Sequence, residues 1–539
     1  MIKRLLTKKS LVSATAVLIY LMAVNFIFHM VTGWQYGIFR DEFYYVSMSR
    51  HLDFGYVDIT PIAVYIMALT RVLFGTSIYA IHVFPALAGS FVMLFAGLTT
   101  RKMGGGKFAQ ALTAVAVMLA PMYLSFAGFF SYDAFDQLMS SIVVFMLVKL
   151  LKGEFTYKTW ILFGFIAGIG VMVKITFGIM LVAFVIGLLL TRQRRVLAGK
   201  WPWIAAAIAL VCFVPYAVWQ AQRGFPFLQY LSNYAVNRSA HAPPWEYFFY
   251  QVMVMNPVAI ILWLGGLVLL FRKSGRMFRP FAWSFLFYFT LAAVLAIKYY
   301  ALAGVMLPLL AYGSVCFERG YKKEPLDVAG PPDAGKQPEP HGKKRPSRVP
   351  RIVYMVALCL VGLFIAPAST PVLPVQDYIA YNNTFHFNET VKTEDTEIGS
   401  LPQHYADRMG WEELAQAVAK VYHSLPEEDR KDCAIFAGNY GEAGALGYYA
   451  QKYDIPVAIS GHLSFYYWGY GDFTGKCVIV VGLPASEHGM LDQAFEEVTP
   501  GTVFHHDYIM PYENDLPIYV CKGLKIPLDQ LWKSVQSFS

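Results

Sequence analysis

Long apolar segments are the feature that most constrains how this chain can fold. Runs of about 17–23 apolar residues follow one another from the N-terminus to about residue 369, and a helix of that length crosses a lipid bilayer. The sequence therefore predicts a multi-pass α-helical membrane protein. We expect about eleven spans, near residues 11–31, 77–98, 108–129, 134–150, 159–173, 175–190, 202–219, 248–271, 280–297, 299–317 and 352–369.

The composition supports this prediction and argues against a nucleic-acid-binding protein. Of the 539 residues, 56% are hydrophobic and only 15% are charged, whereas about a quarter of the residues in a soluble protein are charged. The net charge of +8 does not come from one basic surface, because the lysines and arginines lie in short loops between the spans. This distribution indicates membrane orientation, and we expect no nucleic acid partner.

Alternate loops hold most of the basic residues, which predicts how the chain is oriented. These loops contain Lys3 to Lys9, Arg101 to Lys107, Lys149 to Lys158, Arg192 to Lys200, Arg272 to Arg279 and Lys322 to Arg351. Because basic loops stay in the cytoplasm, we expect a cytoplasmic N-terminus and a location in the cell (inner) membrane. The first apolar run is long for a signal peptide and no small-residue cleavage site follows it, so we interpret it as an uncleaved span.

Four regions follow from these patterns. Residues 1–317 form the main transmembrane domain, and its first outer loop should contain two helices that lie in the membrane interface, within residues 41–74. Residues 318–351 are rich in Pro, Gly and Lys and form a predicted disordered cytoplasmic linker. Residues 352–369 form the last transmembrane helix. Residues 370–539 have the composition of a soluble domain, which should be extracytoplasmic.

The C-terminal region predicts a small α/β domain with a mainly parallel sheet. An amphipathic helix is expected over residues 411–425, and short apolar strands over 433–438 and 477–482. Two further strands are expected at 457–459 and 518–521, so that strands and helices alternate.

A glycine-rich turn, Gly438 to Gly444, follows the first of these strands and should open a helix. Such a helix N-terminus is able to bind an anion. The spacing is not G-x-G-x-x-G and no ribose-binding acid is evident, which disfavours a dinucleotide site. The six cysteines are scattered without a C-x-x-C spacing, which argues against a zinc ribbon.

An acidic pair, Asp41-Glu42, stands directly after the first span, where a carboxylate at the membrane face is costly unless it is used. The alternative is that the pair caps an interfacial helix, since acids favour helix N-termini. Asp133 and Asp136 stand at the outer end of the fourth span, on the same predicted side of the membrane. Capping is the alternative for these two acids as well, but several acids on one face predict a shared pocket.

Cations are expected at the same outer face. Lys174 interrupts an apolar run at its outward turn, and Lys298 stands between two spans. A lysine can extend along the membrane surface without function, but lysines on the face that should have few are better explained by an anion. The outer loop 221–246, which contains Arg238 and His241, is long enough to fold over a cleft.

Acids and cations at one outer face match the chemistry of a sugar carried on a polyprenyl phosphate. The leaving group is a phosphate, so cations that neutralise it are needed and a general acid is not. The acceptor hydroxyl needs a base, and one carboxylate suffices. The residues therefore predict a membrane enzyme that transfers a sugar from such a lipid to a hydroxyl group.

Several segments also resemble a known family, glycosyltransferase family 39 and its bacterial protein mannosyltransferase-like members, to which the lipid A aminoarabinose transferase is related. The most specific part is the first outer loop, with Asp41-Glu42-Phe-Tyr-Tyr45, residues 49–56 and Thr60-Pro61. Residues 131–136 resemble the family's second acidic motif. Residues 168–174, Lys298-Tyr-Tyr300 and Pro308 resemble later segments, so the resemblance covers most of residues 1–317.

The resemblance implies a GT-C fold, an undecaprenyl- or dolichyl-phosphate sugar donor, and inversion at the sugar carbon. It makes Asp41 the catalytic base, with Glu42 and Asp133 assisting, and Lys298 and Tyr300 holding the lipid phosphate. We assign Lys174 and Arg238 as further phosphate contacts, and Tyr44, Tyr45, Asp58, Asp136 and His241 to the substrate pocket.

One departure from the family leaves the acceptor open. The aminoarabinose transferase has an acid–lysine pair before the proline that matches Pro61, whereas Ile59-Thr60 stand here. The acceptor is therefore an envelope glycolipid, a polysaccharide or a protein, and membrane lipids are expected partners. The resemblance does not imply a role for the C-terminal domain.

Two other classes of function remain as alternatives. A transporter or flippase of lipid-linked saccharides should show internal repeats and charges near the bilayer midplane, whereas here the charges lie at one face. A sensor would not need about eleven spans. No cofactor is required for the predicted transfer, and a divalent metal is possible but no residue spacing specifies a site.

Overall fold

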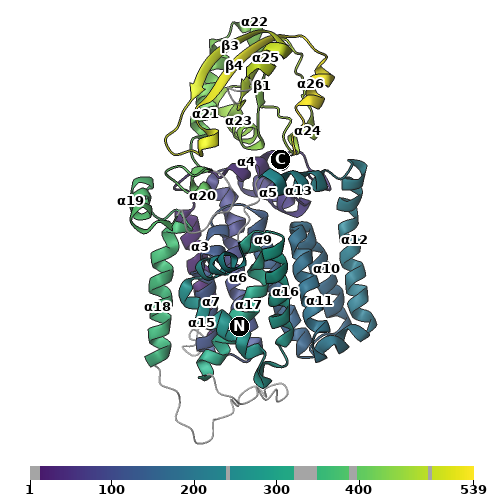
Figure 1. Ribbon diagram of the computed structural model, residues 1–539, viewed down its shortest axis with the longest axis vertical. Coiled ribbons are helices and arrows are strands. Elements are labelled where there is room, and N and C mark those ends of the chain that lie inside the picture. Colours follow the sequence, from purple (N-terminus) through teal and green to yellow (C-terminus); the bar gives the residue numbers. More distant parts are fainter. Residues whose placement is uncertain (1–12, 238–242, 321–348, 388–396, 484–487, 539) are drawn as a thin grey trace, which may run out of the picture.

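A computed structural model describes residues 13–237, 243–320, 349–387, 397–483 and 488–538. A bundle of helices forms one end of the molecule, and an α/β domain made from the C-terminal part of the chain lies on the other end (Figure 1). The structure thus has the helical bundle and the C-terminal α/β region that the sequence predicts. The predicted linker 318–351 lies mostly outside the described residues, which show only its first three and last three residues, at the end of α17 (Ala303–Arg319) and the start of α18 (Val349–Ile365).

Six helical segments among the described residues are long and apolar enough to cross a membrane. They are α3 (Ala14–Thr32), α6 (Ile78–Lys102), α9 (Tyr132–Leu151), α12 (Lys200–Gln222), η4 with α17 (Tyr299–Leu302 and Ala303–Arg319), and α18 with η5 (Val349–Ile365 and Ala366–Ala368). Two bent pairs raise the number to eight, namely α11 (Ile175–Leu189) with η1 (Arg192–Ala198), and α14 (Pro244–Val254) with η2 (Pro257–Ala259) and α15 (Ile260–Leu270). The fold is multi-pass, and the count of about eleven spans stays a prediction.

Shorter elements complete the bundle. They are α5 (Pro61–Phe74), α7 (Lys107–Met118), α8 (Pro121–Phe126), α10 (Tyr157–Val173), η3 (Lys273–Gly275) and α16 (Arg279–Val294). The outer helices expose large apolar side chains, such as Val31 of α3 and Leu210 and Val211 of α12. Apolar surface of this kind is what contact with lipid requires.

Two expected spans are broken by proline. The predicted span 108–129 divides into α7 and α8 at Pro121, and 248–271 turns by 106° before Pro257. Proline lacks a backbone N–H and disfavours helical geometry in the residue before it. In this chain Ala120 is extended and Asn256 has a φ of 66°. The expectation of continuous helices was therefore wrong at these two places.

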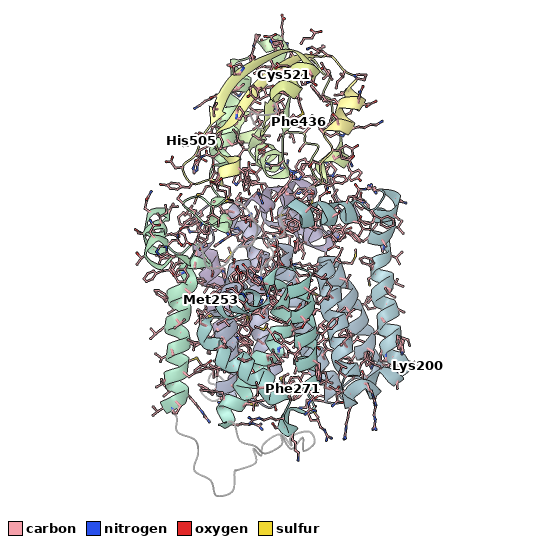
Figure 2. The ribbon with its side chains drawn as sticks, in the orientation of Figure 1. Lys200, Met253, Phe271, Phe436, His505 and Cys521 are labelled. Carbon is pink, nitrogen blue, oxygen red and sulfur yellow. A yellow bond between two sulfur atoms is a disulfide. The ribbon has the colours of Figure 1, made fainter. Side chains whose placement is uncertain are left out.

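The end of the bundle away from the α/β domain holds the predicted basic loops. Figure 2 places Lys200 and Phe271 at the end away from the α/β domain, with Met253 between that end and the domain. Contacts at this end join the predicted basic loops, since Arg319 donates to the carbonyl of Gly104 and Lys102 pairs with Glu154 at 2.7 Å. The loops that were expected to share one side of the membrane are therefore neighbours.

Three helices lie across the other end of the bundle, under the α/β domain (Figure 1): α4 (Arg40–Met48), α5 and α13 (Pro226–Asn237). The predicted helices within 41–74 are thus present, and the first of them ends at Met48. Most of α4 is buried, because it is covered by the α/β domain. The part of α5 near its end exposes Val72, Leu73 and Phe74, as expected for an interfacial helix.

The α/β domain is a sheet with helices on both faces. Its strands are β1 (Cys433–Ala437), β2 (Cys477–Val481), β3 (Phe495–Phe504) and β4 (Leu516–Leu524), in the order β1-β2-β4-β3. The accompanying helices are α21 (Trp411–Ser424), α22 (Glu427–Lys431), α23 (Tyr440–Tyr453), α24 (Phe465–Trp468), α25 (His488–Ala494), η8 (Pro511–Glu513) and α26 (Leu528–Ser534). Two further helices, α19 (Val375–Phe385) and α20 (Gln403–Ala406), lie in the connection between α18 and this domain (Figure 1).

The prediction of a mainly parallel sheet was wrong. Only β1 and β2 are parallel, while β4 pairs antiparallel with both β2 and β3. The strand β3 was missed, because its residues are mostly exposed and lack an apolar pattern. Residues 457–459 form no strand, although Ile459 makes an isolated bridge to Phe436.

Cys433 and Cys477 form a disulfide between the neighbouring strands β1 and β2. Disulfides persist in oxidising compartments and are rare in the cytoplasm. Cys521, the third cysteine of this domain, is buried and free.

Helix α23 packs closely on α4, and this contact joins the α/β domain to the bundle. A Cβ atom added to Gly441 would lie 2.5 Å from Arg40 Cγ, and one added to Gly444 would lie 2.9 Å from Phe43 Cβ. The predicted glycine-rich turn therefore allows close approach of two helices. Its expected anion site was wrong, since Asn439 and Glu442 of the chain itself already occupy the free N–H groups at the start of α23.

Two buried carboxyl groups, Glu442 and Glu513, lie together behind this contact. Glu442 accepts hydrogen bonds from the backbone of Gly438 (2.9 Å) and Asn439 (3.2 Å), and the Asn439 side chain donates to Glu513 at 3.0 Å. Burial raises the pKa of both carboxyls, and the nearby Glu442 charge raises the pKa of Glu513 further. The pair therefore holds a proton that ordinary glutamates release.

The close packing of α23 predicts that Gly444→Ala destabilises the protein. The added methyl would force apart two buried helices, and overpacking costs about 1–3 kcal/mol. Gly447→Ala is the matched control, because its Cβ would lie 3.5 Å from the nearest atom, Val457 Cγ1. Alanine is favoured over glycine in helices by about 0.5–1 kcal/mol, so this control should melt at the same or a higher temperature. Equal melting temperatures for the two variants would contradict the packing argument.

The carboxyl pair predicts a pH dependence of stability. Because the folded-state pKa values lie above the unfolded value near 4.3, the folded state holds a proton that the unfolded state has lost, and stability falls as the pH rises above that value. Glu513→Gln keeps an acceptor for Asn439 and offers Glu442 a donor. This variant should melt at a higher temperature than the parent at about pH 8 and should show a smaller slope between about pH 5 and pH 8. The exposed Glu497→Gln is the control, and unchanged slopes in both variants would contradict the prediction.

Candidate active site

A cavity of about 280 Å³ lies where the bundle meets the connection to the α/β domain. The broken helices supply much of its apolar wall, with Pro121, Met122, Phe126, Met253 and Pro257. Its polar and aromatic lining includes Arg40, Asp41, Ser125, Ser131, Tyr132, Asp133, Lys298, Tyr299, Tyr300, Ser369, Gln403, His404 and Asp407. Non-helical backbone at membrane depth is tolerated where it is buried or lines a cavity, which gives the two proline breaks a structural reason.

Four of the predicted site residues come together in this cavity: Asp41, Asp133, Lys298 and Tyr300. They come from α4, α9, the residue before η4, and η4 itself. These segments are far apart in the sequence, so the fold brings two acids and a cation to one place. The catalytic and phosphate-binding roles of these four residues stay predictions.

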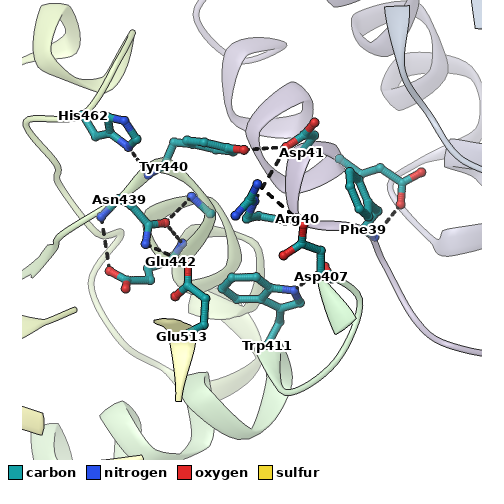
Figure 3. A network of polar contacts seen from close by, with 12 residues as sticks. Phe39, Arg40, Asp41, Asp407, Trp411, Asn439, Tyr440, Glu442, His462 and Glu513 are labelled. Carbon is teal, nitrogen blue, oxygen red and sulfur yellow. Dashed lines mark hydrogen bonds and ion pairs between the residues drawn. The ribbon is translucent and has the colours of Figure 1, made fainter. Parts of the chain in front are cut away.

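Asp41 is the acid best placed to meet a substrate. Its side chain is 41% exposed, whereas that of Glu42 is completely buried. Asp41 Oδ1 accepts a hydrogen bond of 2.6 Å from the hydroxyl of Tyr440, and Arg40 Nε lies 3.9 Å from the same oxygen. These contacts hold one carboxylate oxygen of Asp41 within the cavity wall (Figure 3).

Glu42 is turned away from the cavity, so its predicted position beside the reacting groups is corrected. Its carboxylate accepts hydrogen bonds from the backbone N–H groups of Phe39 and Phe130 and lies 2.9 Å from His82 Nε2. Burial alone would raise the pKa of Glu42, but His82, Arg408 and the Phe130 N–H together hold it below the usual range. Glu42 therefore stays charged and fixes the start of α4, which corresponds to the capping alternative.

Asp133 is paired with Lys174. Lys174 Nζ donates to Asp133 Oδ1, and the Ser131 hydroxyl donates to Asp133 Oδ2 at 3.1 Å. Lys174 itself does not line the cavity, and its ammonium group lies 4.9 Å and 5.0 Å from the ring centres of Tyr132 and Tyr300. Lys174 is therefore the partner of Asp133. In this geometry Lys174 does not make a direct contact with a phosphate in the cavity.

Lys298 lies in the cavity wall directly before Tyr299 and Tyr300. Its ammonium group is 5.3 Å from the centre of the Tyr234 ring, which belongs to α13. A lysine at a cavity wall beside aromatic rings is suited to an anion, because an ammonium group presents three donors and a full charge.

Four other residues assigned to the substrate pocket lie outside this cavity. Tyr44 is buried under the α/β domain and donates to Asp58 at 3.0 Å. Burial raises the pKa of Asp58 to about 7. The Tyr45 hydroxyl accepts from the backbone of Tyr132 at 3.3 Å, and Asp136 is buried within α9. None of these four residues lines this cavity, and their assignment to the substrate pocket stays a prediction. Arg238 and His241 lie outside the described residues.

Several lining residues were missed by sequence reasoning. His404 follows the last span by more than thirty residues, and no motif marks it. Burial and the charge of Arg408 lower the pKa of His404 to about 4, so its ring is neutral. No role was predicted for Arg40, although its place next to Asp41 was a usable signal. Tyr440 belongs to a separate domain, and only the fold brings it to Asp41.

A second cavity, of about 420 Å³, lies at the basic end of the bundle and is not a comparable site. Its lining includes Arg192, Arg194, Arg276 and Arg279. None of the described residues that line it is acidic, so it offers no base. Within the described part of the chain, no three or more His, Cys, Asp or Glu side chains are grouped to hold a metal ion.

The candidate site therefore combines an accessible carboxylate, a lysine, a neutral histidine and an apolar wall. A carboxylate within reach of a hydroxyl group can act as a general base. A lysine can stabilise negative charge that develops on a leaving group. The apolar wall suits the chain of an amphiphile whose head is charged.

Comparison with known proteins gives one family and one fold. Residues 58–219 match the family model described as dolichyl-phosphate-mannose-protein mannosyltransferase. No curated protein has a sequence significantly similar to this chain.

Solved structures of ArnT from Cupriavidus metallidurans are similar to it along nearly the whole length. The apo structure has a TM-score of 0.57 at 15% sequence identity, and the structure bound to undecaprenyl phosphate has a TM-score of 0.60 at 14% identity. In both comparisons 94% of this chain and 98% of ArnT are covered. The predicted resemblance is thereby confirmed: the chain has the GT-C fold, and its residues 58–219 are similar to the protein mannosyltransferase family model.

Proposed function

We propose that this protein is an integral-membrane glycosyltransferase that moves a sugar from a polyprenyl-phosphate donor to a hydroxyl acceptor. The observation that carries the proposal is the cavity in which Asp41 and Lys298 share a wall with apolar residues of the broken helices. The ArnT structure with bound undecaprenyl phosphate supports it, because that protein has the same fold. The sugar is a hexose or a pentose, and the acceptor is an envelope lipid, a glycan or a protein.

The transfer needs one bond to form and one to break. The acceptor hydroxyl loses its proton to Asp41 as its oxygen attacks the sugar carbon from the side opposite the phosphate. The bond between that carbon and the phosphate oxygen breaks, and the electron pair leaves with the phosphate. Lys298 neutralises the phosphate and the Tyr300 hydroxyl donates a hydrogen bond to it. Attack from the opposite side inverts the configuration at the sugar carbon.

Asp133 and Lys174 act together in this scheme. Their ion pair places the Asp133 carboxylate in the cavity wall with its charge partly compensated. Lys174 also adds positive charge behind Tyr300, because its ammonium group faces that ring. The pair thus supports the phosphate end of the site without a direct contact from Lys174.

We infer that the site lies at the outer face of the cell (inner) membrane. The basic loops meet at the end of the bundle away from the α/β domain, and basic loops face the cytoplasm. The disulfide in the α/β domain supports an extracytoplasmic location, since such bonds persist under oxidising conditions. The N-terminus is then cytoplasmic.

Asp41→Asn should abolish transfer while the protein still folds and inserts. The amide cannot accept the proton, and loss of a general base lowers kcat by about 10²–10⁴-fold. Transfer from a radiolabelled polyprenyl-phosphate sugar to envelope extract measures the effect. The exposed Asp472→Asn is the matched control and should keep full activity. Undiminished transfer by Asp41→Asn would remove Asp41 as the base.

Lys298→Ala should weaken use of the lipid donor. A hydrogen bond to a charged group contributes about 1.5–3 kcal/mol, so the KM for the donor should rise by at least about tenfold. Lys420→Ala, on the exposed face of α21, removes the same charge far from the cavity and is the control. A KM for the donor that stays at the parent value would argue against a phosphate contact at Lys298.

A further inference from the structure

The hydroxyl of Tyr440 donates to the carboxylate of Asp41 across the boundary between the α/β domain and the bundle. The bond is 2.6 Å long and joins residues that are 399 positions apart. Figure 3 shows Tyr440 reaching Asp41 from the start of α23, while the second oxygen of Asp41 points away from it. The C-terminal domain therefore contacts the residue that the proposed function makes the base.

The Tyr440 side chain is held in place from several directions. Its ring lies 5.1 Å from the ring of Tyr44 and 5.4 Å from that of His462, and the Arg40 guanidinium stands 5.3 Å from its centre. Its backbone N–H donates to His462 Nδ1 at 3.0 Å. Burial raises the pKa of Tyr440 well above its usual range, so the phenol keeps its proton and stays a donor.

Asp41 has no comparable partner elsewhere in the described chain. Arg40 Nε is 3.9 Å from the oxygen that Tyr440 contacts, which is an ion-pair distance and not a hydrogen bond. The guanidinium group of Arg40 is engaged by Asp407 at 3.6 Å and by the Tyr512 hydroxyl. Tyr440 is thus the donor that fixes the orientation of the Asp41 carboxylate.

We propose that Tyr440 is a positioning residue for Asp41, and that the α/β domain is part of the active site. The inference rests on the proposed function for the role of Asp41. The hydrogen bond occupies Oδ1 and leaves Oδ2 to receive the proton of the acceptor hydroxyl.

Tyr440→Phe tests this assignment, because the ring and its packing stay while the hydroxyl is lost. The kcat for transfer should fall by about tenfold, the value of one such hydrogen bond, and the KM for the lipid donor should change little.

Tyr448→Phe is the matched control. Tyr448 is on the same helix, and its hydroxyl also crosses to the bundle, where it donates to the carbonyl of Thr76 at 2.8 Å. This variant loses an equivalent contact between the domains without touching Asp41. Its kcat and its KM for the lipid donor should match the parent. Equal changes in the two variants would show that only domain docking matters and would overturn the proposal.

A double-mutant cycle tests the contact without any activity measurement. Melting temperatures are compared for the parent, Tyr440→Phe, Asp41→Ala and the double variant in detergent. Residues in direct contact have non-additive effects, so the double variant should depart from the sum of the single shifts by on the order of 1–2 °C. Additive shifts would overturn the contact.

These measurements separate failure of the inference from failure of the proposed function. Full transfer by Asp41→Asn together with a non-additive cycle would overturn the proposed base but keep the contact, and Tyr440 would then be structural. Loss of transfer by Asp41→Asn with an unchanged kcat in Tyr440→Phe would keep the base and overturn the positioning role.

Discussion

The contact between α4 and α23 is the interaction on which the rest of the site depends. It places a buried cation, Arg40, between the bundle and the α/β domain, where Asp407 and the ring of Tyr440 compensate its charge. A buried charge is costly unless it is paired, and removing one partner of such a pair destabilises by about 3–5 kcal/mol. The bundle supplies Arg40, and the C-terminal part of the chain supplies Asp407 and Tyr440. Neither part could bury its charged group alone, so this contact joins the two. Because Asp41 follows Arg40 directly, the same contact fixes the orientation of the acid in the cavity.

The cavity itself exists because two helices stop short. Continuous helices over 108–129 and 248–271 would fill the bundle with regular packing, whereas the breaks before Pro121 and Pro257 turn the chain and leave space beside α9. The free backbone groups at the breaks are satisfied locally, for example by the Asn256 side chain, which accepts from the N–H of Val258 at 3.1 Å. The two helix breaks therefore also form the cavity of the candidate site.

The sequence was most informative where a single physical rule dominates. Hydrophobic length and loop charge predicted the helical bundle, and the first outer loop predicted Asp41. Sequence reasoning failed where the outcome depends on neighbours distant in the chain. It could not separate Asp41 from Glu42, because only the fold buries Glu42 against Phe130 and His82. It interpreted the turn from Gly438 to Gly444 at the start of α23 as an anion site, because the packing of Phe43 against Gly444 is visible only in three dimensions.

The distance in sequence between Asp41 and Tyr440 also bears on how the protein is made. The first outer loop leaves the ribosome early, but its partner in the α/β domain is synthesised 399 residues later and after the last span. On the proposed topology, that domain must be exported and folded, with its disulfide formed, before the two halves meet. A chain arrested in the membrane at any earlier stage would hold the acid without its donor. The protein would then become able to transfer a sugar only when its synthesis, export and folding are complete.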